Sequence, residues 1–113
     1  MKYKTSELIG KLLDAAVAKA NFCDKADEVL LVLNSGFTAD GFSPSSNWAH
    51  GGPIIERERI SVGAGVQDYA DQWSAWMRND DGSVKGGVLQ GHTSLEAAMR
   101  AFVAAKIGEE AEL

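Results

Sequence analysis

Residues 92–110 read HTSLEAAMRAFVAAKIGEE and predict the best-defined helix of the chain. Thr93 and Glu96 have the spacing of a capping box, in which the threonine hydroxyl serves the amide three residues on and the glutamate reaches back. The apolar face that follows recurs at helical spacing and consists of Leu95, Ala98, Met99, Phe102 and Ile107. Lys106 suits the negative end of the helix dipole, and Gly108 is a good terminator, so the helix is expected to end there.

A second helix is predicted at residues 5–20, TSELIGKLLDAAVAKA, with Thr5 or Ser6 as its cap. Its apolar stripe consists of Leu8, Ile9, Leu12, Leu13, Ala16, Val17 and Ala20. Between the helices, turn-rich segments at 34–47 and 79–82 separate the runs that predict strands, which are 28–33, 53–63, 72–78 and 86–91. Strands joined by short turns favour antiparallel pairing. We therefore predict an α+β fold, with a small, mainly antiparallel β-sheet packed by an N-terminal and a C-terminal helix in a single domain, residues 1–113.

The composition argues against several classes of function. The formal net charge is −5, from 16 acidic and 11 basic residues, whereas binding to duplex nucleic acid needs many Lys and Arg on phosphates. No signal peptide and no membrane-spanning apolar run is recognised, so a cytosolic protein is expected. The single cysteine, Cys23, allows no intramolecular disulfide and is expected to be a small apolar residue. His50 and His92 lie in separate segments, and no phosphate-binding loop, dinucleotide motif or nucleophile elbow is present. We expect no catalysis, no metal and no cofactor.

The predicted strand PIIERERISVG, residues 53–63, carries its charges on separate faces. Because strand side chains alternate, Arg57 and Arg59 would share one face, with their guanidiniums about 6–7 Å apart. That spacing suits two oxygens of a phosphate pair or two carboxylates of a partner. The alternative is an exposed edge strand whose charges only prevent aggregation.

The segment before this strand has the residues of a binding loop. Trp48 and His50 have flat rings that can stack on a planar ligand, although Trp48 could equally pack into the core. Gly51 and Gly52 allow a ligand to approach backbone amides closely. The full set of predicted ligand-binding residues is Ser45, Asn47, Trp48, His50, Gly51, Gly52, Arg57 and Arg59. This set favours a small anionic, nucleotide-like ligand, held in a pocket that a homo-oligomer could deepen.

A different function class is suggested by the aromatic residues Trp73 and Trp76. On a strand they point to opposite faces, so at most one is expected in the core, and an interface is the other place for them. With the acidic surface, they could form a contact with a host protein. The adaptor hypothesis therefore stays open beside ligand binding.

Three stretches resemble the NinX-like family of small bacteriophage and prophage proteins. They are SPSSNWAHGGPIIERERISV at 43–62, KTSELIGKLLDAAVAKA at 4–20 and SLEAAMRAFVAAKIGEE at 94–110. The resemblance implies a phage accessory protein that acts in the bacterial host cytoplasm, and it implies no catalytic residues. Phages make small oligomeric proteins that sequester nucleotide-derived signals of host immunity, and by analogy of size, origin and loop chemistry this is the function we expect.

Overall fold

The computed structural model describes residues 2–21, 43–66 and 69–112. Its helices are α1 (Gly10–Asn21), α4 (Trp48–Glu58) and α5 (Ser94–Lys106), with a short 3-10 helix, η1, at Thr5–Glu7. Its strands are β1 (Lys2–Lys4), β2 (Ser61–Val66), β3 (Tyr69–Arg78), β4 (Val84–Gly91) and β5 (Glu110–Glu112). This is the predicted α+β class, with a small antiparallel sheet packed by helices.

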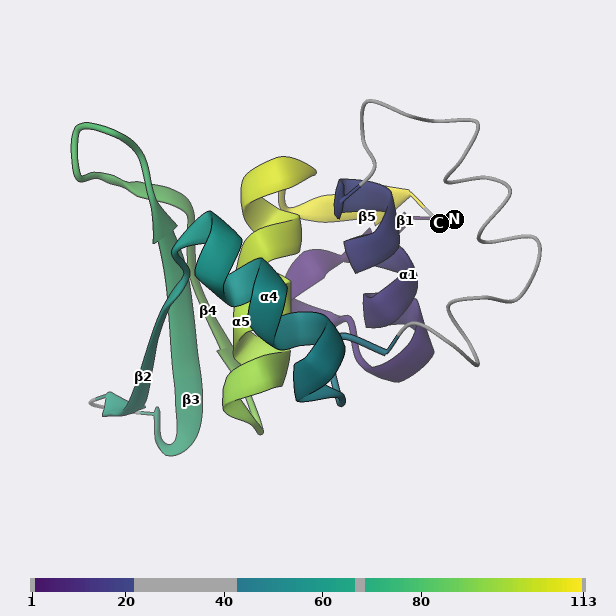
Figure 1. The fold of residues 1–113 in the computed structure, drawn as a ribbon, viewed down its shortest axis with the longest axis horizontal. Coiled ribbons are helices and arrows are strands. Elements are labelled where there is room, and N and C mark those ends of the chain that lie inside the picture. Colours follow the sequence, from purple (N-terminus) through teal and green to yellow (C-terminus); the bar gives the residue numbers. More distant parts are fainter. Residues whose placement is uncertain (1, 22–42, 67–68, 113) are drawn as a thin grey trace.

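Strands β2, β3 and β4 form a three-stranded antiparallel sheet in that order. Figure 1 shows this sheet on one side of the molecule, with α5 lying along its inner face. Helices α1 and α4 pack against α5 from its other sides. The predicted strands at 72–78 and 86–91 are confirmed within β3 and β4. The turn predicted at 79–82 is also confirmed, because the Gly82 amide donates to the Asn79 carbonyl oxygen at 2.9 Å.

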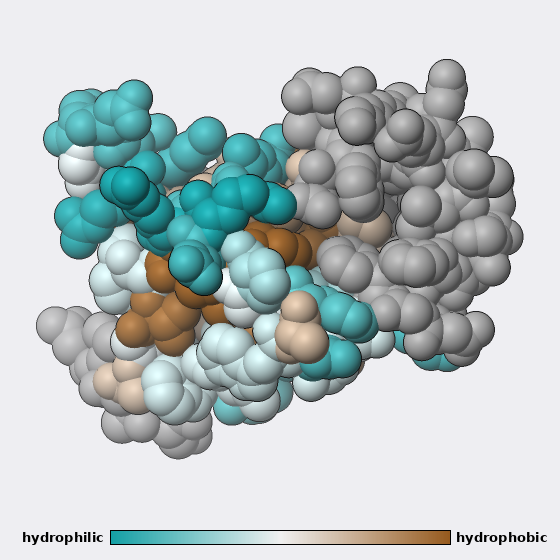
Figure 2. Space-filling model, viewed as in Figure 1, coloured by the Kyte–Doolittle hydropathy of each residue, from teal (hydrophilic) through white to brown (hydrophobic). Residues whose placement is uncertain are grey.

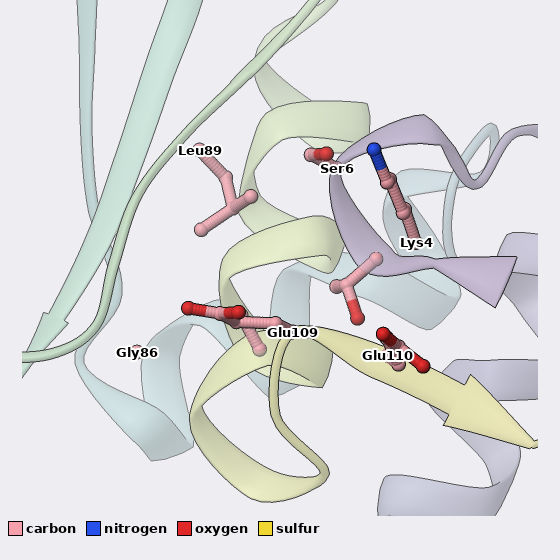
Figure 3. A pocket seen from close by; sticks show the side chains of 8 residues that line it. Lys4, Ser6, Gly86, Leu89, Glu109 and Glu110 are labelled. Atoms are coloured by element: carbon pink, nitrogen blue, oxygen red, sulfur yellow. The ribbon is translucent and has the colours of Figure 1, made fainter.

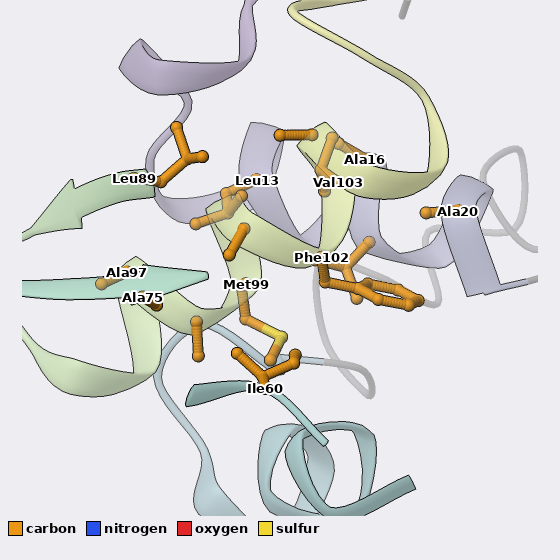
Figure 4. Close-up of a cluster of buried hydrophobic side chains, with 14 of the residues drawn as sticks. Leu13, Ala16, Ala20, Ile60, Ala75, Leu89, Ala97, Met99, Phe102 and Val103 are labelled. Atoms are coloured by element: carbon orange, nitrogen blue, oxygen red, sulfur yellow. The ribbon is translucent and has the colours of Figure 1, made fainter. Parts of the chain in front are cut away.

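Helix α5 is the centre of the core rather than a helix with one buried face. Its buried residues are Leu95, Ala97, Ala98, Met99, Arg100, Ala101, Phe102, Val103 and Ala104. Figure 4 shows Met99, Phe102 and Val103 among side chains contributed by α1 and the sheet. The sheet covers one side of α5 and the other helices cover the rest, so small alanines are needed where backbones approach. The predicted apolar face is confirmed. The structure shows that α5 is also buried outside this face, at residues such as Ala97, Ala101 and Ala104.

The two ends of the described chain pair with each other. Strand β1 runs antiparallel to β5, with Lys2 opposite Glu112 and Lys4 opposite Glu110. Thr5 continues this pairing, since its amide donates to the Glu109 carbonyl oxygen at 2.8 Å and its hydroxyl to that of Gly108 at 2.6 Å. The sequence did not predict either strand, because three residues are too few for a periodic pattern.

The prediction of a strand at 53–63 is wrong over most of its length. Residues up to Glu58 belong to α4, and only the segment from Ser61 onward lies in β2. Ile54 and Ile55 favour a strand locally, but the helix buries Gly51 and Ile54, three residues apart, against the core. Asn47 caps α4 by accepting the Ala49 amide at 2.9 Å.

The N-terminal helix begins later than predicted. Thr5 lies in η1 and donates to a carbonyl oxygen, so it does not cap a helix. Helix α1 starts at Gly10, whose φ of +56° is readily adopted only by glycine. The break turns Ile9 and Leu12 outward, while the rest of the predicted stripe is buried: Leu8, Leu13, Ala16, Val17 and Ala20. The predicted strand 28–33, Cys23 and the turns at 34–42 lie outside the described residues.

Candidate functional site

Helix α4 divides the predicted ligand-binding residues between its two ends. The amino end carries Ser45, Asn47, Trp48, His50, Gly51 and Gly52, and the carboxyl end carries Arg57 and Arg59. An 11-residue helix is about 16–17 Å long at about 1.5 Å per residue. The predicted arginine face of a strand is therefore absent, and the two groups lie at separate places on the surface.

The amino end of α4 borders a hollow of about 370 Å³. The lining residues are Gly10, Ser45, Ser46, Trp48, Thr93, Leu95 and Glu96. They belong to the first turns of α1, α4 and α5 or to the residues just before them. Figure 1 shows that the three helices run in a common direction, with their amino ends on the same, lower side of the view. We call this place the amino-end hollow.

The turn before α4 is held in place by hydrogen bonds to the helices. The buried carboxylate of Asp14, on α1, accepts the Ser45 amide at 2.8 Å. The Nδ1 atom of His50 accepts the Ser43 amide at 2.9 Å, so one nitrogen of this ring is used in fixing the turn. The hydroxyl and amide groups of the turn are thus held on one side of the hollow before any ligand arrives.

Gly51 allows α4 to approach α5 closely. A Cβ atom at this position would overlap the carbonyl oxygen of Pro44 and the Cδ1 atom of Leu95. Gly51 is buried, so the structure places it in helix packing, whereas Gly52 is half-buried and would bring a Cβ only to 3.8 Å from the Trp48 ring. The predicted glycine loop is therefore part of a helix that these small residues let pack tightly.

Trp48 is the exposed aromatic wall of the amino-end hollow. This residue is 57% exposed, although a tryptophan is more often largely buried. The alternative that Trp48 packs into the core is therefore wrong. An exposed indole next to a hollow lined by hydroxyl groups is a surface on which a planar ring can stack.

The capping residues set the charge around the hollow. Thr93 accepts the Glu96 amide at 3.0 Å, and Glu96 Oε1 accepts the His92 amide at 3.4 Å, one residue before the amide expected from the sequence. The carboxylate of Glu96 is also paired with Arg100 at 3.1 Å. This pairing offsets the negative charge at a place where three helix dipoles present their positive ends.

Arg100 is a buried residue that connects the segments next to the hollow. It is 9% exposed, and it donates to the carbonyl oxygens of Leu8 at 2.9 Å and Gln90 at 2.7 Å. One side chain thus joins α5 to β4 and to the residue pair before α1. No local pattern predicted this role, because an arginine within an amphipathic helix is usually a solvent-exposed residue.

The carboxyl end of α4 forms a charge cluster. Glu58 pairs with Arg57 at 3.0 Å and with Lys106 of α5 at 3.0 Å. Arg57 lies 6.0 Å from the centroid of the Phe102 ring, and Arg59 ends the helix in the left-handed conformation, with φ of 54°. Figure 2 shows hydrophilic residues gathered around this end of α4 and over the β3–β4 turn.

Burial alone would raise the pKa of Glu58, but hydrogen bonds and positive charge from Lys106 and Arg57 lower it more, so the pKa lies below its ordinary value of 4.5. A lowered folded-state pKa adds stability above the ordinary pKa, and this is lost as the pH falls through the folded value. Glu58→Gln is therefore expected to destabilise the protein at about pH 7 but hardly at about pH 3. Urea unfolding of both proteins at these pH values measures the difference. Glu56→Gln, at an exposed neighbouring position, is the control, and a constant Glu58→Gln effect across pH would contradict the role of the cluster.

A second hollow, of about 210 Å³, lies where β1, η1 and β5 meet β4 and α5. Figure 3 shows Glu109 and Glu110 on its border, with Lys4 nearby. Within the described parts of the chain, no cluster of side chains has the composition of a metal site. Among the same residues, no helix has the length and apolar character needed to cross a membrane.

The sequence predicted two of the seven residues that line the amino-end hollow. Ser45 and Trp48 were predicted as ligand-binding residues and do line it. Thr93 and Glu96 were assigned only to a helix start, and Gly10 to the interior of the predicted helix at 5–20. The capping signal of Thr93 and Glu96 was readable, and a helix start is itself a place where anions bind. What the sequence could not show is that three such starts meet.

Comparison with known proteins supports a phage origin. The family model described as Bacteriophage P22, NinX matches residues 4–106, which include nearly all the residues that form the fold. A search of curated proteins finds no match to the chain. The matched range contains the stretches at 4–20 and 43–62 and all but the last four residues of the stretch at 94–110, and it includes the three helices next to the amino-end hollow. The chain therefore belongs to the bacteriophage P22 NinX family.

Proposed function

We propose that this phage protein binds a small anionic, nucleotide-like ligand in the amino-end hollow and acts in the host cytoplasm by binding rather than by catalysis. The observation that carries the proposal is the meeting of three helix amino ends around one hollow, beside the exposed ring of Trp48. A host immune signal built from nucleotides is the class of ligand that this chemistry and a phage origin favour together.

The helix ends provide the attraction for an anion. The first amides of an α-helix have no partner within the helix, and the aligned peptide dipoles add partial positive charge there. Asn47 and Thr93 each satisfy one such amide, and helix geometry leaves those of Trp48, Ser94 and Leu95 as further donors. Phosphate oxygens are well matched to such groups.

Two carboxylates near the hollow are already compensated. Glu96 is paired with Arg100, and Asp14 accepts the backbone amide of Ser45. Neither carboxylate needs a cation from a ligand. The helix dipoles and the hydroxyl groups therefore determine the charge of the ligand that the hollow prefers. Ser45, Ser46 and Thr93 add hydroxyl groups on the border, and hydroxyl groups both donate and accept hydrogen bonds.

The size of the hollow fits one nucleotide unit rather than a polymer. Its volume of about 370 Å³ is at the lower end of the range of about 300–1,000 Å³ that is usual for small-molecule sites. A base stacked on Trp48 would leave its phosphate toward the helix ends. Base stacking on an aromatic side chain contributes about 1–3 kcal/mol.

The two arginines of α4 lie outside the proposed site. Arg57 and Arg59 are at the far end of the helix, and Arg57 is paired with Glu58. Anion recognition is therefore assigned to backbone dipoles and hydroxyl groups. Mutagenesis can test this assignment. A negative charge introduced at Ser46 should weaken ligand binding, whereas the loss of Arg59 should leave it unchanged.

Ser46→Asp is expected to weaken ligand binding at least about tenfold, because it places a carboxylate where phosphate would lie. Ser46→Asn is the matched control, since it has nearly the same shape without the charge, and Arg59→Gln is the control at the far end of α4. Calorimetric titration with ADP-ribose and with a cyclic dinucleotide measures the affinities. Equal affinities for the Asp and Asn variants would exclude an anion site in the amino-end hollow.

The identity of the ligand can be determined separately. Mass spectrometry of small molecules released on denaturing protein purified from a bacterial host should reveal a phosphate-bearing compound. Trp48→Ala should lower its recovery about tenfold or more, through the loss of stacking. Recovery that does not depend on Trp48 would place the ligand elsewhere.

A further inference from the structure

The outer face of the three-stranded sheet holds a further hollow, which the proposed function does not use. It measures about 300 Å³ and is lined by Ser74, Trp76, Arg78, Val84 and Val88. The first three alternate along β3, and Ala75 and Met77 between them face α5 and are buried in the core. In Figure 1 this face of the sheet is turned away from α5 and α4. We call it the outer-sheet hollow.

Ser74 is the unusual residue of this hollow. It is 1% exposed, and its hydroxyl is the one fully buried side-chain polar atom among the described residues that has no hydrogen-bond partner. A buried hydroxyl without a partner destabilises the folded state, so such groups are uncommon and call for an explanation. Its cross-strand neighbour on β2 is Gly63, which has no side chain to offer a partner.

The other lining residues of this hollow are three apolar side chains and one arginine. Val84 and Val88 are 43% and 48% exposed, and Trp76 is half-buried beside them. Arg78 stands at the end of the row, where it donates one hydrogen bond to the Gly82 carbonyl oxygen at 3.3 Å. A guanidinium has five N–H donors, so others are available to a ligand.

We propose that the outer-sheet hollow binds a small carboxylic acid with an aromatic or branched aliphatic body. The body contacts Trp76, Val84 and Val88, and the carboxylate is held by Arg78. A rotation about the Cα–Cβ bond of Ser74 lets its hydroxyl donate to the same ligand, since Ser74 lines the hollow and serine has three staggered rotamers. The missing partner of the buried hydroxyl is thus a group of the ligand.

The charge of the hollow supports a carboxylate over a neutral ligand. Within the part of the chain that the structure describes, Arg78 is the only charged residue that lines the hollow, and its hydrogen bond there is to a neutral carbonyl group. A guanidinium and a carboxylate form charge-assisted hydrogen bonds, which are stronger than those between neutral groups.

The test uses 3-phenylpropionate as the probe and 3-phenylpropionamide as its uncharged match, in an NMR titration of the full chain. Shifts should be confined to the lining residues and to the Trp76 indole, with a dissociation constant of about 1–10 mM, typical of a fragment of this size. Arg78→Gln should weaken the acid about fivefold or more and leave the amide unchanged. Shifts spread over the surface, or equal binding of acid and amide, would overturn the proposal.

Ser74→Ala separates a ligand-binding hydroxyl from a merely structural one. The variant should raise Tm by about 2–5 °C, because a buried group without a partner is removed. It should also weaken 3-phenylpropionate binding about threefold or more, whereas Ser6→Ala, at an exposed serine elsewhere, should change neither. Unchanged affinity in Ser74→Ala would overturn the assignment. So would a dimer, detected by sedimentation, whose interface covers the lining residues.

Discussion

Replacing Gly86 by Ala is expected to destabilise the protein by about 3 kcal/mol or more. Gly86 has a φ of +81°, a conformation that costs alanine about 1–2 kcal/mol. A Cβ atom would in addition lie 2.7 Å from the Ala105 amide nitrogen and 2.8 Å from the Ala104 carbonyl carbon. Both belong to the backbone of α5 and cannot move aside as a side chain would, so β4 and α5 must separate.

Gly87→Ala is the matched control for this effect. Gly87 has nearly the same φ, +86°, but a Cβ atom added there would meet nothing within 4 Å beyond its own chain neighbours. Only the conformational cost remains, so about 1–2 kcal/mol is expected. Urea unfolding followed by circular dichroism gives both values, and m should stay constant if only the folded state changes. Equal losses at the two positions would show that strand β4 does not depend on close contact with α5.

Arg100→Met should destabilise the protein by about 3–5 kcal/mol, because it removes one partner of a nearly buried ion pair. The side chains of Arg100 and Glu96 are only 11% and 16% exposed. The substitution leaves the Glu96 carboxylate without its cation and removes the donor to the carbonyl oxygens of Leu8 and Gln90. Methionine preserves much of the volume, so the effect reports on the polar contacts.

Glu96→Gln is the control for the role of Arg100. It removes the charge of the pair but keeps a side-chain oxygen for the His92 amide and the guanidinium, and a loss of about 1 kcal/mol is expected. The difference between the two variants, measured by urea unfolding, combines the loss of the two backbone contacts with the cost of leaving the Glu96 carboxylate without its cation. If Arg100→Met costs no more than Glu96→Gln, Arg100 does not hold the segments together.

The elements that the sequence predicted well have complete local signals. Residues 93–108 combine a capping threonine, a helical apolar period and a terminal glycine, and β3 ends at a turn rich in Asn, Asp and Gly. Helix α4 was missed because its isoleucines and alternating charges fit a strand equally well over a short range. The helical signal was the pair Gly51 and Ile54, which lie three residues apart on the buried side of α4. The pair was missed because glycine does not count as an apolar residue in a periodic pattern.

In the candidate site too, the residues with a local signal were predicted and those that depend on the fold were not. Ser45 and Trp48 were recognised because serines beside an aromatic residue and paired glycines have a binding character that does not depend on the fold. Arg57 and Arg59 were joined to them through strand geometry, and helix geometry places them at the other end of α4. Ser74 carried no signal at all, since a serine becomes unusual only when its surroundings leave its hydroxyl without a partner.

The sequence by itself determined the α+β class, the C-terminal helix with its apolar face, the strands β3 and β4 and the phage family to which the chain belongs. These follow from capping, periodicity and motif, which act over a few residues. The tertiary structure alone decided that β1 pairs with β5, that Arg100 joins three segments and that the amino ends of α1, α4 and α5 meet around one hollow. Each of these depends on contacts between residues far apart in the chain, which are stabilised by packing on α5 and leave no mark on local sequence.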